Sequence, residues 1–172
     1  MTATVNADTG RQRLRTALFL AVAMAATVGS ALAFQYVGGY IPCKLCLEQR
    51  TPYYVGVPLM LLAVLASALR APAWVSRGLL AIGGLLMLYG VYLGVYHSGV
   101  EWAWWPGPTD CTAAAGPVDT GGKGVLDALD KFVPPSCDKA ALRILGLSLA
   151  GWNAIASFVF AAVAFRGAFA RD

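Results

Sequence analysis

Charged side chains are scarce in this chain. Asp, Glu, Lys and Arg together make up 13% of its 172 residues, whereas 58% are hydrophobic. A soluble domain carries about 25% charged residues, so the deficit indicates that much of the surface faces lipid. The net charge of +4 comes from arginines at the ends of apolar runs, without the basic stripe interleaved with aromatics that is typical of nucleic-acid binding. The composition therefore favours a membrane protein over a nucleic-acid-binding one.

Acidic residues and lysine are absent from four long apolar runs, and Arg143, near one edge, is the one charged residue within them. Each run is close to the roughly 20 residues that a helix needs to cross a hydrocarbon core of about 30 Å. Lipid offers no hydrogen-bond partner to an exposed backbone, which excludes irregular spans. The sequence predicts an all-α fold: one domain over residues 1–172, an integral membrane four-helix bundle with spans at about 16–36, 51–69, 78–96 and 142–165.

Two alternatives compete with four spans. Four buried helices of a soluble protein would need polar faces to meet water, and these runs have none. The first run could instead be a cleaved signal peptide, because arginines precede it and Ala31-Leu32-Ala33 resembles a cleavage site. Against this, the run is longer than a usual signal core and continues through Phe34, Tyr36 and Val37. We therefore expect the first run to remain as a span.

The arginines predict the orientation. Three segments contain seven of the nine arginines: the one before the first span, the turn between the second and third spans, and the tail after the fourth. The positive-inside rule assigns these segments, and so both termini, to the cytoplasm. The loops at 37–50 and 97–141 then face outward. Within the longer loop, residues 125–133 have the pattern of a short amphipathic helix on the membrane surface, and Trp102, Trp104 and Trp105 fit an interfacial aromatic belt.

Cysteine is also scarce, and its placement is specific. The chain has four cysteines, Cys43, Cys46, Cys111 and Cys137, and all of them fall in the two outward loops. Cysteines gathered on one side of a membrane favour an oxidising compartment. They form a tight C-x-x-C pair and a loose second pair.

Three kinds of site could use these cysteines. A zinc site is disfavoured, because the second pair lacks the spacing of a metal knuckle. Static disulfides suit Cys111 and Cys137, whose bridge would close a long loop. They suit Cys43 and Cys46 poorly, because a bridge across two residues gains little loop entropy. Redox exchange is therefore the favoured interpretation of the tight pair.

Neighbouring residues favour a reactive thiolate at Cys46. Arg50 follows it by four residues, about one helical turn, and a guanidinium stabilises a thiolate over a thiol. Pro42 can begin a helical turn whose N-terminus adds partial positive charge near both sulfurs. A reactive pair at a membrane surface can exchange with thiols in water and donate electrons to an acceptor in lipid.

These features together resemble the disulfide bond formation protein B (DsbB) family. The resemblance rests on the four spans, on Cys43-Lys44-Leu45-Cys46 with Arg50 opening the second span, and on the cysteine pair in the second loop. The stretches Tyr96–Trp102 and Gly107–Cys111 are similar to the bacterial branch with a short second loop. The C-x-x-C alone is a weak motif, but its position after the first span and the second pair make the combination specific.

The resemblance implies a function and a role for each site residue. A family member reoxidises a periplasmic thioredoxin-fold dithiol oxidase of the DsbA type and passes the electrons to a membrane quinone, ubiquinone or menaquinone, in the bacterial inner membrane. Cys111 would form the mixed disulfide with the partner, and the displaced Cys137 would attack Cys43. Cys46 would then donate to the quinone, with Arg50 stabilising its charge. His97 matches a family histidine near the quinone end.

An acceptor of this kind is needed on energetic grounds. A DsbA-type disulfide has a potential near −120 mV, and the glutathione pool is too reducing to regenerate it. Two other classes remain open. A vitamin K epoxide reductase-like quinone enzyme would place its membrane C-x-x-C late in the chain, unlike this sequence. A non-enzymatic membrane scaffold with structural disulfides would not need a reactive Cys46 or Arg50.

Overall fold

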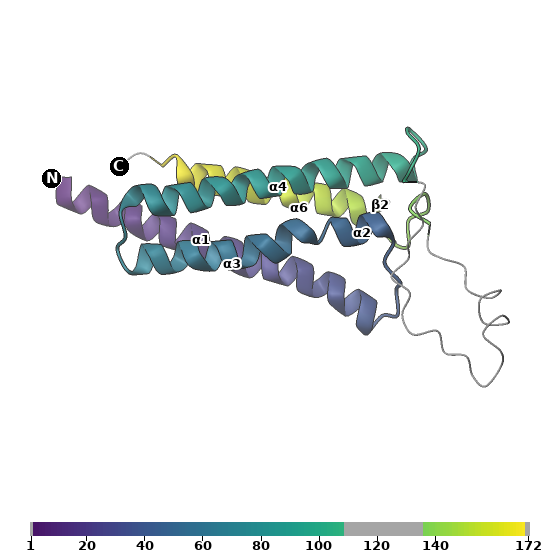
Figure 1. The fold of residues 1–172 in the computed structure, drawn as a ribbon, viewed down its shortest axis with the longest axis horizontal. Coiled ribbons are helices and arrows are strands. Elements are labelled where there is room, and N and C mark those ends of the chain that lie inside the picture. Colours follow the sequence, from purple (N-terminus) through teal and green to yellow (C-terminus); the bar gives the residue numbers. More distant parts are fainter. Residues whose placement is uncertain (1, 109–135, 171–172) are drawn as a thin grey trace.

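The computed structural model describes residues 2–108 and 136–170. Four long helices make up most of this part of the chain. The long helices are α1 (Thr2–Tyr36), α3 (Thr51–Ala68), α4 (Ala73–Glu101) and α6 (Leu149–Ala168). A short helix, α2 (Lys44–Glu48), precedes α3, and the strands β1 (Arg143–Ile144) and β2 (Leu147–Ser148) precede α6. The four long helices run alternately up and down, so both termini lie at one end and α2 and the hairpin lie at the other (Figure 1). The all-α four-helix prediction is confirmed.

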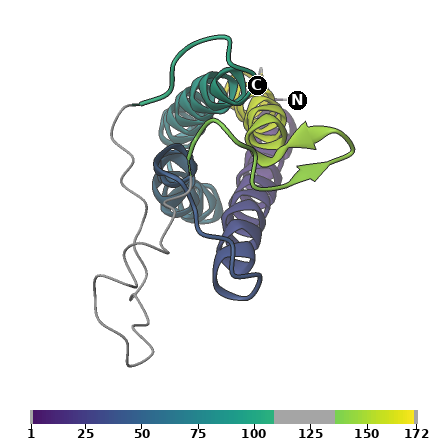
Figure 2. The ribbon, with the colours of Figure 1, turned by 90° about the vertical axis from the view of Figure 1, so that its right-hand side faces the viewer.

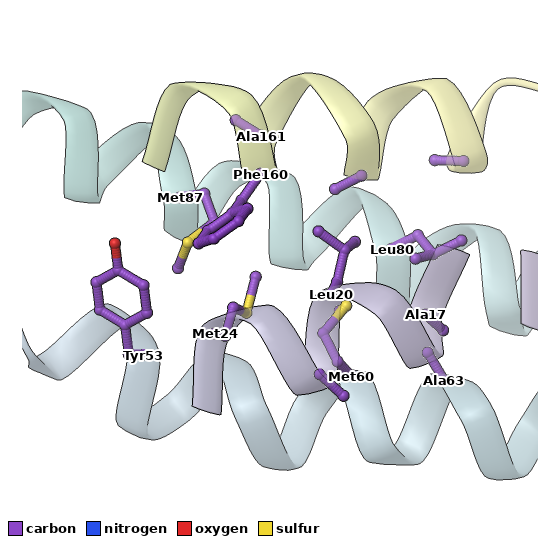
Figure 3. Packing of buried hydrophobic residues seen from close by; sticks show 13 residues of the cluster. Ala17, Leu20, Met24, Tyr53, Met60, Ala63, Leu80, Met87, Phe160 and Ala161 are labelled. Carbon is purple, nitrogen blue, oxygen red and sulfur yellow. The ribbon is translucent and has the colours of Figure 1, made fainter. Parts of the chain in front are cut away.

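The helices close into a ring, seen end-on in Figure 2. Within it α4 packs against α3 and α6, and α1 packs against the other sides of α3 and α6. Side chains of all four fill the interior, including Leu20, Met60, Leu80 and Ala161 (Figure 3). Because α1 contributes fully buried residues, the first predicted span is an integral part of this core.

Small residues allow α4 and α6 to approach closely. A Cβ added at Gly94 would lie 2.9 Å from the backbone nitrogen of Ala154, and one at Gly90 would lie 2.9 Å from the Ser157 hydroxyl. The Gly90-x-x-x-Gly94 pair is therefore a small-residue contact between α4 and α6.

Large apolar side chains cover the outside of the bundle. Phe19, Leu62, Leu85 and Phe158, one from each long helix, are all more than half exposed. All four helical segments, Gly10–Tyr36, Lys44–Ala68, Ala73–Glu101 and Leu149–Ala168, are long and apolar enough to cross a membrane. An exposed apolar surface on every side of a bundle is stable in lipid and not in water. The chain is a multi-pass membrane protein.

Two of the differences between the helix bounds and the predicted spans lie at the cysteine end of the bundle. The third helix continues past residue 96 to Glu101, so His97 lies on α4 rather than in a loop. The fourth helix begins at Leu149 rather than near 142. Leu145 and Gly146 both have positive φ and turn the chain into a two-residue hairpin, as type I′ geometry requires. The apolar composition of 142–148 hid this hairpin, and the Ser148 hydroxyl then caps α6 by accepting from the Gly151 N–H.

Candidate active site at the cysteine end of the bundle

The C-x-x-C pair lies at the end of the bundle opposite the termini (Figure 1). An extended segment returns from α1, and Cys43 then becomes the N-cap of α2, where its sulfur accepts the backbone N–H of Cys46 at 3.3 Å. This cap folds the pair so that the two Sγ atoms lie 2.8 Å apart. A small shift would close a disulfide between them, so the local structure is suited to both redox states.

Cys137 lies beside this pair. Its side chain packs on the small apolar cluster of Cys43, Leu45 and Val100. Burial raises the pKa of the Cys137 thiol to about 11, opposed by a hydrogen bond from the backbone of Leu45. Cys137, the member of the second cysteine pair that is expected to attack Cys43, thus lies next to Cys43. Cys111 and the predicted helix at 125–133 lie outside the described residues.

Cys43 is deeply buried, with 5% of its surface exposed. Its hydrogen bond to Cys46 and its burial raise the pKa of the Cys43 thiol to about 12, while His97 acts in the opposite direction. A thiolate at Cys43 therefore depends on protein donors, because water does not reach it.

His97 is buried on α4 and faces the pair. Its Nε2 lies 3.7 Å from the Cys43 sulfur and 3.8 Å from Glu101 Oε1. Its Nδ1 lies 2.6 Å from the Gln49 amide nitrogen, and Asn153 donates to the Gln49 carbonyl oxygen at 2.7 Å. The resemblance had implied a role for this histidine near the quinone. The structure places it against Cys43.

Arg50 is the N-cap of α3 and is 9% exposed. Its guanidinium donates to the side-chain oxygen of Gln35 and to the carbonyl oxygen of Ala31, both on α1. These bonds hold the cation at the cysteine end of the bundle, within the cavity that both sulfurs also line.

That cavity has a volume of about 610 Å³, within the range of about 300–1,000 Å³ typical of small-molecule sites. Apolar residues of α1 and α6, such as Val28, Phe34 and Ala156, form much of its wall. Cys46, Arg50 and His97 line it too. An apolar wall with a few convergent donors suits a quinone, which has a hydrophobic ring and two carbonyl acceptors. The residues present fit such an acceptor.

A metal ion is the competing occupant. Ligand atoms of Cys43, Cys46 and His97 all lie within 4.8 Å of one another. However, the Gln49 amide nitrogen faces Nδ1 of His97, so a neutral imidazole carries its proton on Nε2, the atom nearest the Cys43 sulfur. A protonated nitrogen is not a metal ligand, and this arrangement favours hydrogen bonding to sulfur.

Five of the six predicted site residues come together here: Cys43, Cys46, Arg50, His97 and Cys137. Sequence reasoning missed Gln35, Gln49 and Asn153. A signal was available, because polar side chains within or beside predicted spans are costly and mark functional sites. Asn153 lies inside the fourth apolar run and Gln35 lies near the end of the first.

A family model for the disulfide bond formation protein DsbB matches residues 12–166 of the chain. The match covers nearly the whole bundle, including both cysteine pairs. The chain belongs to the DsbB family. No match was found among curated proteins or among solved structures. Membership of the DsbB family makes the chain a membrane disulfide oxidoreductase, consistent with the cysteine pair at one end of a four-helix membrane bundle.

Proposed function

We propose that the chain reoxidises a periplasmic thioredoxin-fold dithiol oxidase of the DsbA type and passes the electrons to a membrane quinone, ubiquinone or menaquinone. It would do so in the bacterial inner membrane, with both termini in the cytoplasm and the cysteines on the periplasmic side. The observation that supports this best is the position of the Cys43–Cys46 pair. Cys137 packs against it, and both of its cysteines line the cavity that also contains Arg50.

The proposed exchange begins in the second loop. A thiolate of the reduced partner attacks Cys111 of a Cys111–Cys137 disulfide, and Cys137 leaves with the electron pair. Cys137 then attacks Cys43: a Cys137–Cys43 bond forms, the Cys43–Cys46 bond breaks, and Cys46 leaves as a thiolate. Contact between Cys137 and Cys43 means that this second step needs little movement of either sulfur.

The loop disulfide is then restored. The second thiol of the partner releases Cys111, and Cys111 attacks Cys137, so Cys43 leaves as a thiolate. Two electrons from the partner now reside on Cys43 and Cys46, and the partner is oxidised. Each transfer exchanges one disulfide for another, so no external oxidant is needed up to this point.

Cys46 is the proposed exit for the electrons because it is the thiolate released in the first exchange and its side chain lines the cavity. A bound quinone would supply an acceptor for two electrons and two protons, and Cys43 and Cys46 would re-form their disulfide as they give up these electrons. Arg50 would hold a quinone carbonyl and favour negative charge on the neighbouring sulfur. Gln35 and Ala31 fix the guanidinium in advance, so its side-chain entropy is already lost before binding.

Quinone reduction by the purified protein in detergent tests this function. A reduced thioredoxin-fold dithiol serves as donor, and quinone absorbance reports turnover. We expect turnover with the wild-type chain and none with Cys46→Ser. A folded wild-type protein with both cysteine pairs oxidised that reduces neither ubiquinone nor menaquinone would contradict the proposal and favour a scaffold with structural disulfides.

A further inference from the structure

A line of buried polar side chains runs behind the cysteine pair and joins α3, α6 and α4. Tyr53 lies 2.9 Å from the Ser157 hydroxyl and donates to Asn153 Oδ1 at 2.7 Å. Asn153 Nδ2 donates to Gln49 Oε1 at 2.7 Å, and Gln49 Nε2 lies 2.6 Å from His97 Nδ1. Buried polar groups are costly unless partnered, so a connected line within an apolar bundle calls for an explanation.

The line has a direction. Tyr53 donates to the Asn153 carbonyl, which leaves the Asn153 amide nitrogen facing Gln49. That nitrogen donates to the Gln49 carbonyl, which leaves the Gln49 amide nitrogen facing His97. An amide nitrogen only donates, so Nδ1 of His97 is the acceptor, and the proton of the neutral imidazole is on Nε2.

The Nε2 proton is directed at sulfur. Nε2 lies 3.7 Å from Cys43 Sγ, within hydrogen-bond range for sulfur, and 3.8 Å from Glu101 Oε1, the competing acceptor. Among residues 2–108 and 136–170, the other charged side chains that line this cavity are Arg50 and Lys139, both cations. Because Cys43 is 5% exposed, a negative charge on its sulfur needs a donor from the protein.

We propose that Gln49 and Asn153 are positioning residues that hold the His97 proton on Nε2, where it stabilises Cys43 each time Cys43 leaves as a thiolate. This inference rests on the proposed function. In the proposed exchange, the Cys111 thiolate attacks Cys137 of the Cys137–Cys43 disulfide. The bond to Cys137 forms, the Cys137–Cys43 bond breaks, and the electron pair goes to the Cys43 sulfur. The proton stays on Nε2 of His97, which donates a hydrogen bond to the sulfur. The step therefore involves no proton transfer.

The reactivity of Cys43 as the sole thiol tests this inference. In a reporter chain with Cys46→Ala, Cys111→Ser and Cys137→Ser, the rate of alkylation by iodoacetamide is followed against pH. Gln49→Met keeps the side-chain length and removes both hydrogen bonds. We expect it to slow alkylation about tenfold at pH 8, as for the loss of one hydrogen bond to a charged group, and to move the rise in rate to higher pH. Asn153→Leu should act in the same direction with a smaller effect.

His97→Leu separates positioning from a general structural effect. If Gln49 acts through His97, then Gln49→Met adds nothing further in a chain that already has His97→Leu. The alkylation rate at the high-pH plateau should be the same in all variants, because the full thiolate no longer depends on the donor. Ser76→Ala, at the opposite end of α4, is the matched control and should alkylate like the reporter.

Three results would overturn the inference: alkylation at pH 8 unchanged by Gln49→Met and Asn153→Leu, effects of Gln49→Met and His97→Leu that multiply, or a plateau that rises because the site has opened. The assay needs neither quinone nor partner. A wild-type chain without quinone turnover but with the expected reporter behaviour would therefore remove the proposed function and leave the role of Gln49 intact.

Discussion

The two ends of the bundle have different interiors. Near the termini the helices are held together by fully buried apolar side chains such as Leu20, Met60 and Leu80, beside Ala17 and Ala63 (Figure 3). At the other end the interior contains two thiols, an imidazole, a guanidinium and three amides around a cavity. Tyr53 lies at the border, with its ring against Phe160 and its hydroxyl on the polar side. The apolar end maintains the helix arrangement, and the cysteine end positions chemical groups. Substitutions at the apolar end should therefore lower stability, and substitutions at the cysteine end should lower activity.

The largest expected effect is at the electron exit. Cys46→Ser should reduce quinone turnover by more than about a thousandfold, because loss of a covalent participant removes the step itself. The Cys111–Cys137 bridge should still form, as checked by mass spectrometry of the unreduced protein. Turnover near the wild-type rate in this variant would show that Cys46 takes no covalent part in the reaction. The cysteine end would then not be the catalytic end of the bundle.

Two buried arginines at opposite ends provide a direct comparison. Arg50→Met should raise the KM for quinone about 10- to 100-fold, the scale of one or two hydrogen bonds to a charged group, with a smaller change in thermal stability. Arg13, 3% exposed near the termini, donates to the carbonyl oxygen of Ala170. Arg13→Met should change thermal stability and leave the KM unaltered. Equal loss of stability and quinone use in Arg50→Met would show that Arg50 is structural.

A cavity in the apolar end should affect stability alone. Leu20→Ala removes a fully buried side chain and should lower the free energy of unfolding by about 2–4 kcal/mol. Turnover per folded molecule should remain within about twofold of wild type. Denaturant titration in detergent measures the first quantity, and turnover normalised to the folded fraction measures the second. A selective loss of turnover would contradict the separation between the two ends.

The smallest expected effect concerns Cys137. Its pKa is raised to about 11, chiefly by burial, and contact with Cys43 raises it further. At neutral pH the reduced thiol is protonated, so its alkylation should be slow and should accelerate as the pH rises toward 11. Cys43→Ala removes one of the causes, so the rise in rate should begin at lower pH. Cys46→Ala and Cys111→Ser are included in both chains, and peptide mass spectrometry separates the label on Cys137 from the label on Cys43 in the chain that keeps it. A pH profile that stays in place would mean that Cys137 is not in contact with Cys43.

The fold and half of the site could be predicted from the sequence because their signals are local. Apolar runs of membrane length give the four spans, and the C-x-x-C with Arg50 four residues later gives the cysteine pair and the cation that line the cavity. The contacts of Gln49 depend on α4 and α6, whose residues are far away in the chain, and no local spacing predicts them. The hairpin before α6 was missed for another reason. Its residues are as apolar as a span, and the positive φ at Leu145 and Gly146 has no signal in hydropathy.

The transfer from Cys137 to Cys43 is the central claim, and trapping its intermediate tests it most directly. The oxidised protein is mixed with a reduced thioredoxin-fold dithiol, quenched by rapid alkylation, and analysed by mass spectrometry of its disulfide-linked peptides. We predict a transient Cys43–Cys137 linkage in which Cys46 is alkylated. A Cys43–Cys46 linkage that persists unchanged while the partner is oxidised would contradict the account.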